Sequence, residues 1–207
     1  MTEKFTQEFW DKRYRSRNHL WSGEANHHLV GHVSELGGGT ALDVGCGEGA
    51  DAIWLAERGW RVTALHVSTV ALGRGATHAA EAGANIARRV KWLHEDLMVW
   101  NGPEPDSYDL VTSQFLHLPK EPRESLFRRL AVSVSPGGTL LIVGHHPADL
   151  QPEISREMAE LCFTASEIAA LLDPHEWEII VEAYVERLAI NPGGHTHDAV
   201  LRARRRY

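Results

Sequence analysis

Cysteine is scarce in this chain of 207 residues, which contains only Cys46 and Cys162. Disulfide-stabilised domains need several cysteines, so disulfide bonds are not expected to support this fold. Cys46 also lies inside a glycine-rich turn, which argues against a structural disulfide at that position. Free thiols are typical of a reducing compartment, and we therefore expect a cytoplasmic protein.

The sequence also lacks long apolar runs and an excess of positive charge. No stretch approaches the ~18 apolar residues of a transmembrane helix, and residues 1–10 are too polar and too mixed in charge for a signal peptide. The formal net charge of −7 argues against general binding to nucleic acids or to anionic membranes. The arginines within residues 202–206 form only a short terminal run, which is typical of a solvated strand end. We therefore expect neither a nucleic acid nor a membrane as a partner.

Two kinds of catalytic motif are missing. The chain has no Gly-x-Ser-x-Gly sequence, which argues against a serine hydrolase of the α/β-hydrolase type. Its 13 histidines include the adjacent pairs His27-His28 and His145-His146. Neither pair has the i, i+4 spacing of metal ligands on a helix, and no cysteine cluster accompanies them. The sequence therefore predicts no metal site.

What the chain does contain is the composition of an ordinary globular protein. Hydrophobic residues make up 43% of it and charged residues 24%, and 207 residues are enough to bury one full core. Neither an internal repeat nor a low-complexity linker divides the chain. These features predict a single domain over residues 1–207.

The most informative stretch is residues 40–49, Thr-Ala-Leu-Asp-Val-Gly-Cys-Gly-Glu-Gly, which begins like a short buried strand and ends like a tight turn. An amphipathic helix is expected next, over residues 50–58, and a second strand over residues 61–65. The turn residues that a side chain would obstruct are Gly45, Gly47 and Gly49. A strand, a glycine turn and a helix bring backbone N–H groups and a helix N-terminus close to a ligand. The unit therefore predicts a nucleotide-binding βαβ arrangement.

Hydrophobic periodicity predicts further elements on both sides of this unit. Further strands are predicted over residues 90–94, 108–113, 139–143, 177–189 and 197–205, the last two joined as a hairpin by Asn-Pro-Gly-Gly at 191–194. Helices are predicted over residues 2–16, 27–36, 68–81, 121–135 and 164–172. Thr2 and Ser68 are the expected N-caps of the first and third of these helices, and Thr164–Glu167 is an expected capping box at the start of the last. Five βα-type strands followed by a hairpin predict an α/β fold, a Rossmann-like seven-stranded mixed sheet with helices on both faces.

Three features point together to one family. Asp43 lies two residues before the first glycine, Asp96 follows the third strand, and a hairpin ends the chain. This combination resembles the class I S-adenosylmethionine-dependent methyltransferases over residues 40–145, and by extension over the whole chain. Residues 48–60 and the opening Phe-Trp-Asp of residues 9–11 are most similar to the small-molecule branch that includes the thiopurine- and tellurite-type methyltransferases.

A dinucleotide-binding oxidoreductase is the competing interpretation of the glycine turn. The string Gly45-x-Gly47-x-x-Ala50 also satisfies a loose dinucleotide fingerprint, so by itself it decides little. The further glycine at position 49 and the terminal hairpin favour a site for a methyl donor over a site for a dinucleotide.

The resemblance implies S-adenosylmethionine as the cofactor and a division of the single domain into three parts. Residues 1–37 would form a helical cap, residues 40–145 the cofactor-binding core, and residues 146–207 the substrate side with its loop, helix and hairpin. The glycine turn would hold the methionine portion, and the end of the second strand would hold the ribose. The residues after strands two and three would hold the adenine. Aromatic residues of the cap would cover the cofactor. The residues so implied are Tyr14, Trp21, Asp43, Gly45, Cys46, Gly47, Gly49, His66, Val67, Asp96, Leu97 and Gln114.

The sequence departs from the family pattern at His66. At this strand end the family would have an aspartate or glutamate that accepts both ribose hydroxyls, but this chain has Leu-His-Val-Ser at 65–68. A neutral imidazole has one donor and one acceptor, so it holds one hydroxyl, unless a shift of the turn brings in Ser68. Losing one charge-assisted hydrogen bond costs roughly 1.5–3 kcal/mol, or one to two decades in affinity. We therefore expect weakened cofactor binding, and further weakening once His66 is protonated.

The acceptor side is predicted at the carboxyl ends of the fourth and fifth strands, where ligands bind in an open α/β sheet. The catalytic candidates there are His117, His145 and His146, because an imidazole titrates near neutral pH and can take a proton from an acceptor. The predicted function is methyl transfer from S-adenosylmethionine to a small-molecule acceptor. The alternative is a catalytically degenerate methyltransferase fold that binds a ligand or a partner. Both a monomer and a homodimer are compatible with the sequence.

Overall fold

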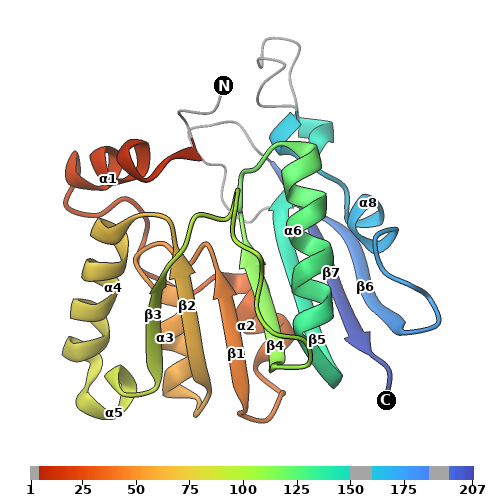
Figure 1. Ribbon diagram of the computed structural model, residues 1–207, viewed down its shortest axis with the longest axis horizontal. Helices are drawn as coiled ribbons and strands as arrows, with labels where there is room; N and C mark the ends of the chain where they lie inside the picture. The colour runs from red at the N-terminus through yellow and green to blue at the C-terminus, as the bar shows by residue number, and fades with distance from the viewer. Residues whose placement is uncertain (1–4, 150–159, 187–195) are drawn as a thin grey trace.

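The computed structural model describes residues 5–149, 160–186 and 196–207. It confirms the predicted α/β architecture, with a seven-stranded sheet of order β3-β2-β1-β4-β5-β7-β6 (Figure 1). The strands are β1 (Thr40–Val44), β2 (Arg61–His66), β3 (Val90–His94), β4 (Tyr108–Gln114), β5 (Val134–His145), β6 (Trp177–Glu186) and β7 (His197–Arg205). The first five strands pair in parallel, and β7 runs antiparallel between β5 and β6.

Helices cover both faces of the sheet, as the alternation of predicted strands and helices required. They are α1 (Gln7–Arg15), α2 (His27–Val33), α3 (Ala50–Glu57), α4 (Thr69–Ala82), α5 (Ala84–Ala87), α6 (Lys120–Ser133) and α8 (Ala165–Ala169), with a 3-10 turn, η2 (Pro147–Asp149). The helices α6 and α8 pack on one face, whereas α2 and α3 pack on the other. No helix in the described parts of the chain is long and apolar enough to cross a membrane.

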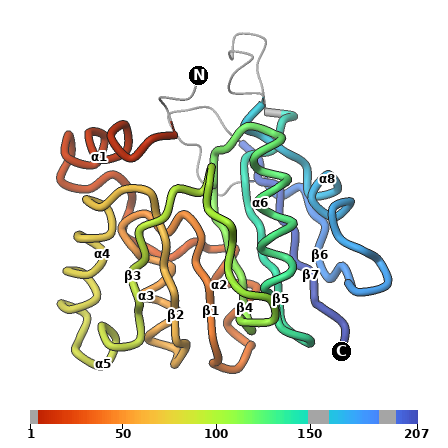
Figure 2. Tube along the Cα trace, viewed as in Figure 1, coloured from red at the N-terminus to blue at the C-terminus, as the bar shows by residue number. Residues whose placement is uncertain are grey.

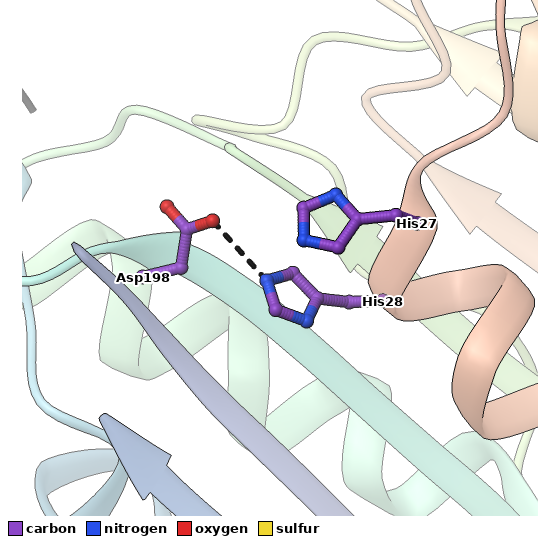
Figure 3. A group of neighbouring side chains, drawn as sticks. All are labelled: His27, His28 and Asp198. Carbon is purple, nitrogen blue, oxygen red and sulfur yellow. Dashed lines mark hydrogen bonds and ion pairs between the residues drawn. The ribbon is translucent and has the colours of Figure 1, made fainter. Parts of the chain in front are cut away.

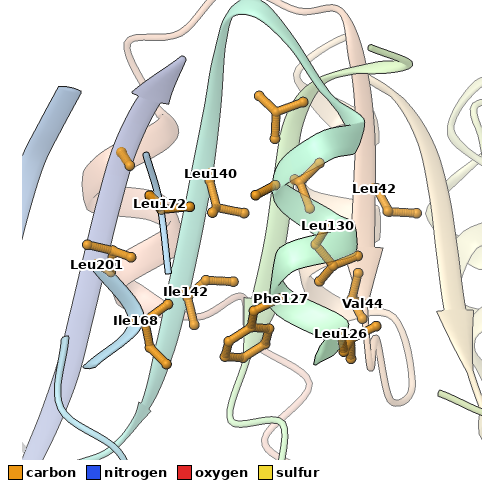
Figure 4. Close-up of a cluster of buried hydrophobic side chains, with 14 of the residues drawn as sticks. Leu42, Val44, Leu126, Phe127, Leu130, Leu140, Ile142, Ile168, Leu172 and Leu201 are labelled. Atoms are coloured by element: carbon orange, nitrogen blue, oxygen red, sulfur yellow. The ribbon is translucent and has the colours of Figure 1, made fainter. Parts of the chain in front are cut away.

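The strand β5 illustrates how the two layers are built from one sequence. Leu140 and Ile142 point to the face covered by α6, where they meet Leu126 and Phe127 (Figure 4). Their neighbours in the chain, such as Leu141, belong to the core on the opposite face. Because successive side chains of a strand alternate between faces, a continuous apolar run fits a strand that is buried on both sides.

The parallel register brings the carboxyl ends of the central strands to a common edge. Val44 pairs with Leu65 in β2, and Gln114 pairs with Val143 in β5. The antiparallel pairing of β5 with β7 places His145 opposite Asp198 at the same edge. The helix α1 lies above this edge, beside the start of α4 (Figure 2). Residues distant in sequence therefore converge there.

Several predicted boundaries were wrong. The first helix starts at Gln7 with Thr6 as its N-cap, because the Thr6 side chain accepts the Phe9 N–H; Thr2 lies outside the described residues. The strand β5 starts at Val134, because Val134 already pairs with Tyr108, and the register with β4 shifts before Thr139 pairs with Leu110.

Other differences concern the ends of elements. The second helix ends at Val33, and α8 ends at Ala169, because single-turn hydrogen bonds replace the helical ladder beyond these residues. The short helix α5 had no counterpart in the predictions. The predicted capping box at Thr164 is confirmed. The expected turn at 191–194 and most of the expected loop at 149–160 lie outside the described residues.

Candidate active site

The glycine turn between β1 and α3 adopts the left-handed backbone conformation that its glycines predicted. Gly45, Gly47 and Gly49 have φ values of 79°, 55° and 84°, in the left-handed region that favours glycine. The N–H groups of Gly45 and Cys46 both donate to the carbonyl of Leu65, at 2.9 and 3.1 Å, which ties the turn to β2. A side chain at position 49 would also clash with the indole of Trp92.

A cavity of about 1200 Å³ opens above this turn at the carboxyl edge of the sheet. Nearly all of the residues implied for the cofactor line it, namely Tyr14, Trp21, Asp43, Gly45, Cys46, Gly47, His66, Val67, Asp96, Leu97 and Gln114. Gly49 does not line the cavity, because it lies beneath the turn against Trp92. The fold thus brings together segments from four strand ends and from the N-terminal loop.

An aromatic pair from the N-terminal segment covers the glycine turn. The indole Nε1 of Trp21 donates to the Tyr14 hydroxyl at 3.1 Å, and a Cβ at Gly47 would lie 3.3 Å from that hydroxyl. Tyr14 is 1% exposed, whereas Trp21 is 51% exposed. Burial raises the pKa of Tyr14 to about 12, against the hydrogen bond from Trp21 that lowers it, so the phenol is neutral at physiological pH. Tyr14 is therefore suited to packing and hydrogen bonding and not to accepting a proton.

Asp11 ties helix α1 to the start of α4 at the carboxyl edge of the sheet, a role that was not predicted from the sequence. Its Oδ1 accepts a hydrogen bond from the Ser68 hydroxyl at 2.6 Å and another from the Val70 N–H at 3.2 Å. Burial raises the pKa of Asp11, but these hydrogen bonds outweigh burial and lower the pKa below its usual value. Since Ser68 is 57 residues away in the chain, no local pattern could have identified this contact.

His66, at the end of β2, offers the cavity a single hydrogen-bond donor. Its Nδ1 accepts the Ser68 N–H at 2.9 Å, so the neutral ring carries its proton on Nε2. Burial lowers the pKa of His66 to about 4, while Asp11 raises it and His94 lowers it further. His66 is therefore neutral at physiological pH, and the weakening expected on its protonation applies only at acidic pH. The Ser68 hydroxyl cannot donate to a ligand, because its proton is already bonded to Asp11, and one of its lone pairs accepts the Ala71 N–H.

Two carboxyl groups, Asp43 and Asp51, form an acidic wall of the cavity. Burial, and then the charge of Asp51, raises the pKa of Asp43 well above its usual range, opposed by a hydrogen bond from the Ala52 N–H. Burial raises the pKa of Asp51 to about 6, opposed by the Asn26 N–H, which donates to its Oδ1 at 2.6 Å. The Oδ2 of Asp43 is buried with no hydrogen-bond partner among the described residues. A cationic or donor group in the cavity would stabilise both carboxylates.

Asp51 was predicted from the sequence only as part of the helix over residues 50–58. An acidic residue in the first turn after a glycine-rich loop was the available signal, but such residues are also common helix-stabilising groups. The contact with Asn26, which closes the N-terminal loop onto the turn, depends on tertiary structure.

The predicted catalytic histidines occupy two different environments. His117 and His145 line the cavity, with ring centroids 5.2 Å apart, and the Nδ1 of His145 lies 3.8 Å from Oδ1 of Asp198. His146 does not line the cavity. Its ring packs on Tyr184 with centroids 4.3 Å apart, and its Nδ1 accepts the Ala148 N–H at 3.1 Å. The geometry thus favours His117 and His145 as the groups that face an acceptor.

A second cluster beside these histidines was not predicted from the sequence. His27 and His28, at the start of α2, lie next to Asp198 of β7, and His28 Nε2 is 3.1 Å from Asp198 Oδ2 (Figure 3). His28 and Asp198 are buried, with exposed fractions of 6% and 0%. The carboxylate is 170 residues away from His28 in the chain, which is why sequence spacing did not suggest the group.

Comparison with known proteins agrees with this geometry. Residues 41–138 match the family model described as a methyltransferase domain. An uncharacterized methyltransferase of Mycobacterium tuberculosis is 36% identical over 115 residues, which cover 56% of this chain and 55% of that protein. The 2-heptyl-1-hydroxyquinolin-4(1H)-one methyltransferase of Mycobacteroides abscessus is 29% identical over 117 residues, which cover 56% of this chain and 50% of that protein.

The chain thus spans about half the length of the curated relatives it matches. A crystal structure of an S-adenosylmethionine-dependent methyltransferase from Mesorhizobium loti matches with a TM-score of 0.66 at 22% identity, covering 86% of this chain and 96% of that one. At this identity the likeness concerns the fold alone. Residues 41–138 are therefore similar in sequence to methyltransferase domains, and the described residues have the fold seen in S-adenosylmethionine-dependent methyltransferases.

Proposed function

We propose that this chain transfers a methyl group from S-adenosylmethionine to a small-molecule acceptor. The observation that carries the proposal is the acidic wall formed by Asp43 and Asp51 directly beside the glycine turn, within one cavity. S-adenosylmethionine carries an ammonium group and a sulfonium, and when bound it supplies the electrophilic methyl group. A buried and a half-buried carboxyl group with raised pKa values are suited to such a cation, because the cation favours their ionised form.

The remaining contacts with the donor follow from the positions of the lining residues. We assign the methionine portion to the turn residues Gly45 and Gly47, next to Gln114. Val67, Asp96 and Leu97, after the neighbouring strands β2 and β3, are assigned to the adenine. Tyr14 and Trp21 would cover the reacting end and exclude water.

His66 alters how the ribose is recognised. Because Nδ1 is already bonded to Ser68, the ring presents only the Nε2 proton, which one hydroxyl oxygen can accept. The two-hydroxyl acceptor of the family pattern is absent at this position, and we expect a lower affinity for the donor. The same observation favours the alternative function, a fold that has lost methyl transfer and binds another ligand in the cavity.

On the acceptor side, the chain positions the substrate and receives a proton where one must leave. His145 lies in the cavity wall, where its Nδ1 is 3.8 Å from the Asp198 carboxylate, and we assign to its imidazole the role of receiving that proton. His117 packs beside it. The similarity of residues 9–11 and 48–60 to the thiopurine- and tellurite-type branch supports a small acceptor, and the two cysteine thiols suit a reducing cytoplasm.

Calorimetric titration of the full chain with S-adenosylmethionine and S-adenosylhomocysteine tests this function. We compare wild type, His66→Asp, and His175→Asp, a matched change in an exposed turn far from the cavity. Restoring a carboxylate should tighten binding roughly tenfold to a hundredfold, and the change at 175 should leave it unaltered. If neither ligand binds to any of the three proteins and neither raises the melting temperature, the methyl-transfer proposal is wrong and the alternative function is favoured.

A further inference from the structure

Two histidines and one carboxylate meet at the wall of the cavity, from opposite ends of the sequence. His27 and His28 open the helix α2, and Asp198 lies in β7 (Figure 3). One ligand atom from each residue can be chosen such that all three lie within 4.8 Å of one another. Two imidazoles and a carboxylate are the donor set of many catalytic zinc sites and of non-haem iron sites.

The distances are compatible with closure around one ion. Ligand atoms about 2.1 Å from a tetrahedral metal lie roughly 3.4 Å from one another. The pair His28 Nε2 and Asp198 Oδ2, at 3.1 Å, already meets this requirement. The remaining adjustment falls on His27, which is exposed and whose ring lies beside the His28 ring with centroids 3.9 Å apart.

The surroundings hold the two buried ligands in place. The side chain of Asn26 accepts the His28 N–H at 2.8 Å and thereby caps α2 at this position. Asp198 lies opposite His145 in the β5–β7 register, and its second oxygen is 3.8 Å from His145 Nδ1. A carboxylate that contacts a further imidazole while facing a metal is a common outer-shell arrangement, and such contacts orient the ligand.

We propose that His27, His28 and Asp198 bind a divalent transition-metal ion, of which Zn²⁺ is the expected member. Nitrogen ligands together with a carboxylate favour Zn²⁺, Ni²⁺, Co²⁺ or Fe²⁺ over Mg²⁺ and Ca²⁺, which prefer oxygen ligands throughout. On binding, the metal replaces any proton between His28 and Asp198, and that proton passes to solvent.

The proposed metal site opens toward the cavity. His27 lines the cavity, as does the neighbouring His145, so the coordination positions that the protein does not fill face the cavity. An acceptor oxygen or thiolate would occupy such a position and would be held in its deprotonated form. This role rests on the proposed methyl transfer, whereas metal binding itself does not.

The test uses the full chain, purified without a polyhistidine tag and freed of metal by a chelator. Zn²⁺ is titrated in a competition assay with a chromogenic chelator, and Co²⁺ is titrated while its visible absorption is recorded. We expect one equivalent of Zn²⁺ and a Co²⁺ spectrum of low-symmetry, inner-sphere coordination. His27→Ala should weaken binding by at least roughly tenfold, because an exposed ligand is lost without disturbing the core.

The matched control is His19→Ala, which removes one ring of a separate histidine pair at the cavity, His19 and His78, with ring centroids 6.3 Å apart. It should leave the affinity unchanged. Asp198→Asn supplies a second variant, with circular dichroism to verify its fold. The proposal is overturned if Zn²⁺ binding is unchanged in His27→Ala, if it is lost in His19→Ala, or if it never reaches one equivalent. Because no methyl donor is present, failure here is distinguishable from failure of the donor titration.

Discussion

The backbone N–H of Ser68 donates to Nδ1 of His66 at 2.9 Å, while the Ser68 hydroxyl donates to Asp11 at 2.6 Å. Ser68 therefore links the end of β2 to the cap helix α1 and decides the tautomer of His66 at the same time. It also caps α4, since its Oγ accepts the Ala71 N–H. One serine thus decides which hydrogen-bonding group His66 can offer to the cavity.

The buried His66 makes stability depend on pH. Its pKa is lowered to about 4 in the folded protein, from 6.5 for an unperturbed histidine, so between these values the unfolded chain binds more protons than the native one. The free energy of unfolding should therefore fall as the pH is lowered from 6.5 to 4, by about 3 kcal/mol from this group. Urea denaturation at pH 7 and pH 4 measures it. In His66→Asn, whose amide oxygen replaces the Nδ1 acceptor, this part of the loss should vanish; equal losses in both proteins would contradict the assignment.

The affinity for a cationic donor should depend on Asp51. The pKa of Asp51 is raised to about 6, so the carboxylate is ionised at pH 7 and mostly protonated at pH 5. Binding of S-adenosylmethionine should weaken roughly threefold to tenfold between pH 7 and pH 5, because the charge that attracts the cation is lost. Calorimetry on Asp51→Asn should show a smaller pH dependence than wild type. Glu57→Gln, an exposed change on the same helix, serves as the control and should behave like wild type.

The attachment of the cap helix should depend on Asp11 and not on its exposed partner. Asp11→Ala leaves the Ser68 hydroxyl and the Val70 N–H without their acceptor, at a cost of about 3 kcal/mol in the free energy of unfolding. Arg15, one turn further along α1, lies 3.6 Å from Asp11 but is mostly exposed, so Arg15→Ala should cost less than about 1 kcal/mol. Denaturant midpoints of the two variants distinguish a buried anchor from a surface ion pair. Similar shifts in both variants would refute the assignment of Asp11 as a buried anchor.

Replacing two glycines by alanine should change the stability of the protein in opposite directions. At Gly49, φ is 84° and a Cβ would clash with Trp92, so Gly49→Ala should destabilise the protein by at least about 2 kcal/mol. Trp92→Leu in the same chain should recover part of that loss. At Gly73, inside α4, a Cβ meets nothing within 4 Å, so Gly73→Ala should stabilise by roughly 0.5–1 kcal/mol. Melting temperatures test both, and a harmless Gly49→Ala would show that the turn relaxes.

The elements themselves were determined by local sequence. The run from Thr40 to Gly49 carries its own strand pattern and its own glycines, and both were confirmed because neighbouring residues alone decide such a turn. The same is true of the capping box at Thr164, whose two hydrogen bonds lie within three residues. Alternating patterns likewise sufficed for β7, although the start of β5 depended on its pairing with β4.

Only the tertiary structure decided what the polar groups at the carboxyl edge can do. Asp11 meets Ser68, Asn26 meets Asp51, and His28 meets Asp198 across separations of 57, 25 and 170 residues. Burial then shifts the pKa values of His66 and Asp51 away from those of the isolated side chains. The physical reason is that backbone propensities act within one or two turns, whereas hydrogen-bond partners and desolvation exist only after the chain has packed.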